Sequence, residues 1–205
     1  MSPAATRGVE RALAPHRERY EAEVELLVRA AFAVIRRTGS ASPTVAEILA
    51  EAGLSTTAFY RHFPTKDDLL VTLLERAHER TGQHIARAVE TAPDPAARVD
   101  AWITALFDMV ATRRDVRANR PFLLAHPRLL ERYPDEIGAG IDRLVAGLAE
   151  LLEAAGAEGI DPAVTARLTY HLVFGYLVDR AALDAPVDPA TVAAVCAHTR
   201  AAASI

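Results

Sequence analysis

The sequence predicts an all-α protein, and three observations support that prediction. Apolar residues recur at intervals of three and four over most of the 205 residues, as they do along one face of a helix. An aspartate followed by a proline, a pair that favours the start of a helix, stands at Asp161-Pro162 and again at Asp188-Pro189. No stretch shows the strict alternation of apolar and polar residues that a half-buried strand would need.

The first residues differ from the rest because they lack this periodic pattern. Residues 1–18 include Gly8 and Pro15, and we expect them to form a flexible arm. From about Arg19 to Arg37 the helical spacing is clear, and Gly39 is placed to end that helix. Its inward stripe is predicted to consist of Val24, Leu27, Val28, Ala31, Phe32 and Ile35.

The stretch from residue 44 to residue 70 predicts two short helices joined by a tight turn. Thr44 and Glu47 have the spacing of a capping box, and Gly53 can adopt the positive φ that a sharp turn requires. Ser55 is a good N-cap for a second helix, from Thr56 to about Arg61. Its phenylalanines are expected to point inward, while a polar face without an acid stays outside, formed by Thr56, Thr57, Tyr60 and His62. This arrangement indicates a DNA-binding helix-turn-helix.

At these residues the chain resembles the TetR family of transcriptional regulators. The matching phrases are Ala-Gly-Leu-Ser at 52–55, Phe-Tyr-Arg-His-Phe at 59–63 and Pro-Thr-Lys-Asp-Asp-Leu-Leu at 64–70, within roughly the first third of the chain. The resemblance implies a three-helix DNA-binding domain over residues 19–65, followed by a helical ligand-binding and dimerisation domain over residues 66–205.

The resemblance also implies which residues meet DNA. It places the helix of residues 56–62 in the major groove and puts phosphates on Thr44, Tyr60 and Lys66. The full set of expected DNA contacts is Thr44, Ser55, Thr56, Thr57, Tyr60, Arg61, His62 and Lys66. One departure from the family is that Thr57-Ala58 stands where members often have Gly-Thr, so Thr56 or Thr57 would replace the usual threonine contact.

The distribution of charge supports this interpretation. The net charge of −4 argues against a nucleic-acid protein, but residues 1–66 carry nine basic against seven acidic side chains. Lys66 is the only lysine and stands in the predicted first turn of a helix, where the helix dipole disfavours a cation. A phosphate bound between the ammonium and the helix-end amides would explain that position. Thr44, Ser55 and Thr65 would nevertheless serve equally well as ordinary helix caps.

The remaining residues predict a series of further helices. Residues 117–133 are expected to form one or two short helices, because Pro121 and Pro127 interrupt them. Longer helices are predicted over residues 65–91, 96–113, 134–155, 162–183 and 189–202.

The helix of residues 162–183 is apolar around most of its circumference, so it must be covered on two sides. The two explanations are a monomer core and a two-fold four-helix dimer interface, and the resemblance implies the second. The expected interface residues, on this helix and the last one, are Tyr176, Leu177, Ala194 and Ala197.

The resemblance further implies a pocket for a small molecule, and the apolar composition suggests a hydrophobic or amphipathic effector. The candidate lining residues, each of which could instead be ordinary core, are Trp102, Leu106, Phe107, Met109, Phe122, Tyr133, His171 and Phe174.

The sequence argues against other classes of function. It has no nucleophile elbow, no glycine-rich phosphate loop and no His-x-x-x-His or Cys-x-x-Cys spacing, so we expect neither catalysis nor a metal or other cofactor. Cys196 is the single cysteine, and no apolar run is long enough to cross a bilayer, so we expect a cytoplasmic protein. The alternative to a regulator is a helical small-molecule-binding or protein-interaction module without a DNA role.

Overall fold

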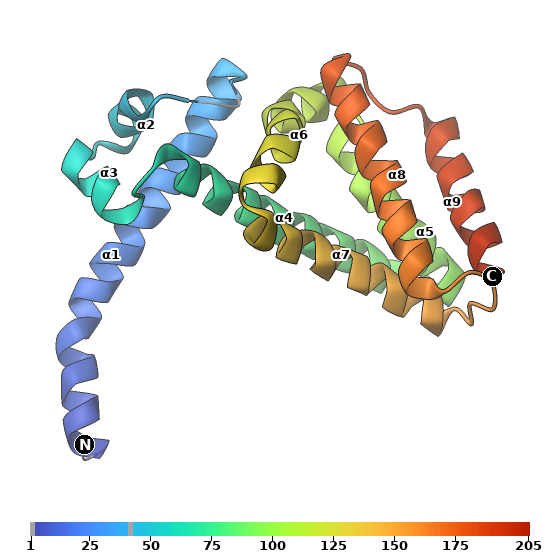
Figure 1. The fold of residues 1–205 in the computed structure, drawn as a ribbon, viewed down its shortest axis with the longest axis horizontal. Coiled ribbons are helices and arrows are strands. Elements are labelled where there is room, and N and C mark those ends of the chain that lie inside the picture. The colour runs from blue at the N-terminus through green and yellow to red at the C-terminus, as the bar shows by residue number, and fades with distance from the viewer. Residues whose placement is uncertain (1–2, 41–42) are drawn as a thin grey trace. The chain divides into compact units, whose positions relative to one another are not determined.

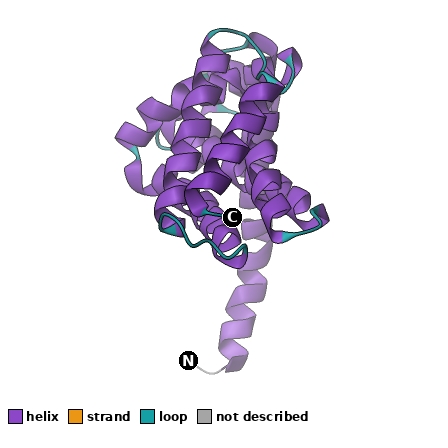
Figure 2. Cartoon of the chain, turned by 90° about the vertical axis from the view of Figure 1, so that its right-hand side faces the viewer, coloured by secondary structure: helices purple, strands orange, loops and turns teal. Residues whose placement is uncertain are grey.

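The computed structural model describes residues 3–40 and 43–205, and within these ranges every regular element is a helix (Figure 2). For residues 3–13 and 15 only the backbone is described. The chain divides into two compact units, Met1–Thr72 and Leu73–Ile205. The all-α prediction is confirmed.

The first unit contains helices α1 (Pro3–Thr38), α2 (Val45–Ala52) and α3 (Thr56–His62) together with the beginning of α4 (Lys66–Thr91) (Figure 1). α1 packs against both α2 and α3. The core of the unit consists of side chains that expose almost nothing to solvent: Leu27, Ala31, Val34, Ile35, Ile48, Phe59 and Leu69. The predicted inward stripe of the first long helix therefore supplies much of this core.

The N-terminal helix is longer than the sequence predicts. The helix expected from about Arg19 begins at Pro3, and Pro15 lies within it. The segment around Pro15 is rich in alanine, arginine and glutamate, which favour helix, and one proline removes only one backbone hydrogen bond. Residues 1 and 2 of the predicted arm lie outside the described residues, and the flexibility of the arm stays a prediction. Gly39 ends α1 as expected, with φ of 67° and its amide on the Ile35 carbonyl at 2.8 Å.

The second unit contains the rest of α4 and five further α-helices. These are α5 (Pro95–Phe107), α6 (Arg113–Arg132), α7 (Pro134–Ala154), α8 (Pro162–Ala182) and α9 (Pro189–Ala203), with a short 3-10 turn, η1 (Asp108–Val110), after α5. Asp94, Asp161 and Asp188 cap α5, α8 and α9, each followed by a proline in the first turn. The predicted Asp-Pro helix starts are confirmed.

Two predicted helix boundaries in this unit are wrong. The helix expected to run from about residue 96 to residue 113 ends at Phe107, because the chain tightens into η1. The segment of residues 117–133, expected to form one or two short helices interrupted by its prolines, belongs to the single 20-residue helix α6, which contains both Pro121 and Pro127 and begins at Arg113. A capping box between Thr112 and Asp115 starts α6, and its packing against α8 and α7 offsets the hydrogen bonds that the prolines remove.

α8 is the central helix of the second unit, since it contacts α5, α6, α7, α9 and η1. Figure 1 shows α9 lying alongside α8. The buried side chains at this centre include Trp102, Leu148, Tyr170, Val173 and Leu177. Within the described residues, no helix has both the length and the hydropathy needed to cross a bilayer.

The boundary between the units falls between Thr72 and Leu73, whereas the sequence analysis placed it between residues 65 and 66. The first turns of α4 therefore belong to the first unit. Leu69 and Leu70 are buried there, with at most 4% of their surface exposed.

Candidate DNA-binding surface and effector pocket

The turn between α2 and α3 has the geometry that the sequence predicts. The Thr44 hydroxyl accepts a hydrogen bond from the Glu47 amide at 3.2 Å, and the Glu47 carboxylate accepts one from the Thr44 amide at 2.7 Å. Gly53 adopts φ of 66°, and its amide donates to the Leu49 carbonyl at 2.9 Å. The Ser55 hydroxyl then accepts from the Ala58 amide at 3.2 Å and begins α3. The capping box, the glycine turn and the N-cap are confirmed.

α3 presents polar side chains on its exposed face. Thr56, Thr57 and Tyr60 are all exposed, and more than half of the Tyr60 surface, 52%, is open to solvent. On the opposite face, Phe59 and Phe63 are buried. Lys66 is half-buried in the first turn of α4, next to Thr65, whose hydroxyl accepts from the Asp68 amide. These hydroxyl groups and this ammonium are suited to phosphate oxygens and base edges.

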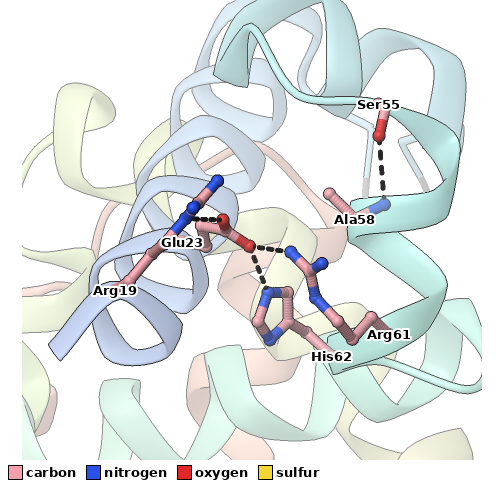
Figure 3. A network of polar contacts seen from close by, with 6 residues as sticks. All are labelled: Arg19, Glu23, Ser55, Ala58, Arg61 and His62. Carbon is pink, nitrogen blue, oxygen red and sulfur yellow. Dashed lines mark hydrogen bonds and ion pairs between the residues drawn. The ribbon is translucent and has the colours of Figure 1, made fainter. Parts of the chain in front are cut away.

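The end of α3 does not match the predicted exposed face. The side chain of His62 is fully buried, and its Nε2 lies 2.8 Å from a Glu23 carboxylate oxygen. Arg61 pairs with the same oxygen, while Arg19 binds the other one at 3.3 Å (Figure 3). Tyr20 completes the cluster with its ring at 4.2 Å from the His62 ring. The prediction that His62 lies outside, on a surface without an acid, is wrong because α1 brings an acid against it.

The hydrogen bond with His62, followed by the hydrogen bond and charge of Arg61, lowers the pKa of Glu23 to about 2. Glu23 is therefore a stable anion that ties α1 to the end of α3. A sequence signal for this contact existed: Glu23 precedes Leu27 by one helical turn, so it begins the inward stripe of α1. An acid on such a stripe requires a partner.

The second unit contains a small, apolar cavity. Its free volume is about 30 Å³, and the residues that line it come from α4, α5, η1, α6, α7 and α8: Leu74, Ala77, His78, Thr81, Leu106, Met109, Phe122, Leu123, His126, Leu144, Tyr170 and Phe174. Asn119 helps to shape this region, because its side-chain amide donates to the Met109 carbonyl at 2.9 Å.

Only part of the predicted pocket set lines this cavity. Leu106, Met109, Phe122 and Phe174 do so. The other four predicted residues lie elsewhere. Trp102 is a core residue with 2% of its surface exposed, and Phe107 borders a separate groove beside α9. Tyr133 stands at the junction of α6 and α7, and His171 is exposed.

Two histidines line the cavity, and neither was predicted from the sequence to do so. His126 exposes only 4% of its surface, and its ring lies 4.5 Å from the Phe174 ring and 5.7 Å from the His78 ring. Within the described part of the chain, His126 Nε2 and His78 Nδ1 are both buried without a hydrogen-bond partner. A signal existed for His78, which follows Leu74 by one turn on the inward stripe of α4, but the sequence around His126 does not distinguish it.

Both rings are uncharged at neutral pH. Burial, and next the charge of Arg143, lowers the pKa of His78 to about 4. Burial, and next the repulsion that a protonated His78 would exert, lowers the pKa of His126 to about 4. The absence of a side chain at Gly140 leaves room for the His78 ring, because a Cβ there would collide with it.

α8 and α9 share an exposed face that is largely apolar. Leu168 and Leu172 expose 60% and 45% of their surface, and Ala194 and Ala197 are exposed on α9. Two of the four predicted interface residues are not exposed on this face. Leu177 is completely buried within the chain, and Tyr176 is half-buried with its hydroxyl 3.3 Å from that of Thr191. The outward side of α8 is therefore the one that carries Leu168 and Leu172.

The fold is similar to those of solved regulators. The fatty acid degradation regulator FadR from Bacillus halodurans superposes with a TM-score of 0.67 at 19% identity, covering 86% of this chain and 94% of that one. A TetR transcription regulator from Haloarcula marismortui superposes with a TM-score of 0.66 at 23% identity, and the match covers 90% of this chain and 97% of that one. RolR in complex with resorcinol superposes with a TM-score of 0.63 at 20% identity, and the match covers 92% of this chain and 91% of that one. Because the sequence identities are only 19–23%, these comparisons show a similar fold and nothing further.

A comparison of the sequence with curated proteins finds no match. A comparison with protein families finds one: the family of bacterial regulatory proteins named after TetR matches residues 27–73. That range begins within the buried stripe of α1, includes α2, the Gly53 turn and α3, and ends just past the unit boundary in α4. Residues 27–73 therefore form the DNA-binding segment of the TetR family of bacterial regulatory proteins, and the chain as a whole has the fold of the solved regulators.

Proposed function

We propose that this regulator is a repressor. In this proposal, a two-fold dimer binds a palindromic operator and releases it when a small molecule enters the cavity of the second unit. The observation that carries the proposal is the exposed polar face of α3, which is held by a capped helix and a glycine turn within the segment that matches the family.

The proposed DNA contacts differ from the full predicted set in one respect. Arg61 and His62 bind Glu23, so we leave both out. Thr56 and Thr57 would read base edges, while Tyr60 and Lys66 would bind phosphates. Thr44 and Ser55 are exposed at the starts of their helices, where a phosphate can also approach the amides.

The proposed dimer interface is the exposed face of α8 and α9. Leu168 and Leu172 form an apolar surface there, next to the small side chains of Ala194 and Ala197, which permit close approach of a second pair of helices. A two-fold axis would present two copies of α3 to successive major grooves, about 34–36 Å apart. This spacing is what a palindromic operator requires.

The proposed effector site is the cavity lined by Leu106, Met109 and Phe122. RolR, which shares the fold, has been solved with resorcinol, and a small molecule of that kind fits the regulatory role proposed here. α4 supplies Leu74 and His78 to the cavity and begins at Lys66, so one continuous helix carries both a ligand contact and a DNA contact. Coupling through such a helix is reciprocal and typically amounts to ~1–3 kcal/mol.

Binding of the purified protein to operator DNA selected from fragments of the source genome tests the proposal. We expect affinity to fall steeply with salt, and Lys66→Ala to lower the slope of log affinity against log salt by about 0.9 on every sequence. Thr57→Ala is the matched control, because a lost base contact should instead change base preference by ~1–3 kcal/mol at one position of each half-site. An unchanged slope in Lys66→Ala would remove that residue from the DNA contacts, and failure to select any DNA would reject the function.

A further inference from the structure

The chemistry of the cavity restricts which molecules it can bind. None of the residues that line it is an aspartate, glutamate, lysine or arginine. A carboxylate or ammonium group placed there would lose its water without gaining a countercharge, which is unfavourable. Arg143 acts electrostatically on His78 but is not one of the lining residues. The cavity is therefore suited to an uncharged ligand.

The cavity nevertheless contains polar groups that need a partner. His126 is almost completely buried, and its Nε2 has no hydrogen-bond partner among the residues that the structure describes. His78 Nδ1 is also unpartnered, but its ring lies against the backbone of α7 at Gly140. His78 Nδ1 therefore faces α7, which leaves His126 Nε2 as the nitrogen available for a ligand. A neutral imidazole can accept one hydrogen bond and donate another, and a hydroxyl group can supply either partner.

The walls of the cavity favour a flat ring. The Phe174 ring stacks on the Tyr170 ring with 5.6 Å between their centres and an angle of 14° between the planes, and the centre of the His126 ring lies 4.5 Å from that of Phe174. Aromatic edges and faces of this kind pair well with an aromatic ligand.

The size of the cavity sets a further limit. A free volume of about 30 Å³ holds roughly two water molecules, so a ligand must displace side chains to enter. Met109 and Phe122 are both half-buried, and the flexible methionine can change rotamer at small cost. Such rearrangement makes room for one ring more readily than for a fused or branched molecule.

We propose that the effector is a small, uncharged aromatic molecule with a hydroxyl group, and that this hydroxyl group forms a hydrogen bond with His126 Nε2. This inference rests on the proposed function, since it concerns the site where the effector is proposed to act. It assigns His126 as the residue that selects the polar group of the ligand.

Calorimetric titration of the purified protein without DNA tests the inference with four probes of similar size: phenol, toluene, benzoate and benzylammonium. We expect phenol to bind at least ten times more tightly than each of the others. His126→Leu should remove the difference between phenol and toluene while toluene binding persists, because the substitution replaces the polar group with an apolar one. His171→Leu is the matched control, since His171 is exposed and outside the cavity, and it should leave the preference unchanged.

Three results would overturn the inference: no detectable binding of phenol, tighter binding of benzoate or benzylammonium than of phenol, or an unchanged preference in His126→Leu. The thermal unfolding temperature of each variant establishes that it is folded. A separate titration of operator DNA distinguishes the two proposals, because loss of DNA binding rejects the proposed function, whereas the direct titration with probes still decides the ligand class.

Discussion

Glu23 shows how one residue can change the interpretation of a surface. Arg61 and His62 stand in the phrase that resembles the family, and as isolated residues both are suited to DNA. The structure pairs both with the Glu23 carboxylate, and this ion pair compensates the charge of Arg61. Nothing in residues 56–62 alone reveals this, because the acid comes from α1 and the contact depends on how two helices pack.

This pairing predicts different roles for two neighbouring cations. Because Glu23 already neutralises Arg61, Arg61→Ala should reduce the salt dependence of DNA binding much less than Lys66→Ala, for which the expected loss of slope is about 0.9. Parallel filter-binding or fluorescence titrations over a range of salt concentrations measure both slopes. If both variants lost the same amount of slope, Arg61 would have to leave Glu23 and bind phosphate in the complex with DNA.

At the scale of elements, side-chain caps predicted helix starts well, whereas prolines within a segment did not predict a break in the helix. Asp161-Pro162 and Asp188-Pro189 act within a single turn, so the sequence alone reveals the starts of α8 and α9. Pro121 and Pro127 also act locally, but their cost is offset by packing against other helices, which no local pattern records. The continuity of α6 was therefore not predictable from its prolines.

The exposed face of α8 and α9 leads to a prediction about assembly. Leu168→Glu and Ala197→Arg should each yield monomers in sedimentation velocity and weaken operator binding, because a charge would be buried at the proposed interface. Leu124→Glu provides the control, since Leu124 is also an exposed leucine, at 38%, but lies on α6. This variant should stay dimeric. Dimers of Leu168→Glu at micromolar concentration would place the interface on another surface.

At the scale of the whole molecule, the fold and the family were accessible from sequence, but the cavity was only partly so. Leu106 and Phe174 were identified because apolar side chains at helical spacing point into a helical domain. The same reasoning wrongly favoured Trp102, which has the same spacing but fills the core. Whether an inward side chain meets another side chain or an empty space depends on the relative placement of several helices, and His126 is recognisable only from that placement.

Ionisable groups of the two units titrate in different pH ranges, which predicts two stages of acid destabilisation. His78 and His126 have pKa values of about 4 in the folded chain against an ordinary 6.5, so between these values the unfolded chain binds protons that the folded chain does not. The free energy of unfolding should therefore decrease as the pH falls from 6.5 to 4 and change no further from this cause below 4. Glu23, with a pKa of about 2 against 4.5, stabilises the first unit above pH 4.5, and this contribution is lost as the pH falls from 4.5 to 2.

Urea unfolding at a series of pH values separates the two stages. Trp102 is the only tryptophan and is buried in the second unit, so its fluorescence reports that unit, while circular dichroism reports the helices of both. His126→Gln should flatten the decrease in the fluorescence midpoint between pH 6.5 and 4, because it removes one of the two buried rings that resist protonation. Glu23→Gln should leave that decrease intact, lower the circular dichroism midpoint above pH 4.5, and remove the part of its further decrease between pH 4.5 and 2 that comes from Glu23. If His126→Gln loses stability with pH as steeply as the unmodified chain, His126 is protonated in the folded state, and the cavity is not the neutral site that its lining indicates.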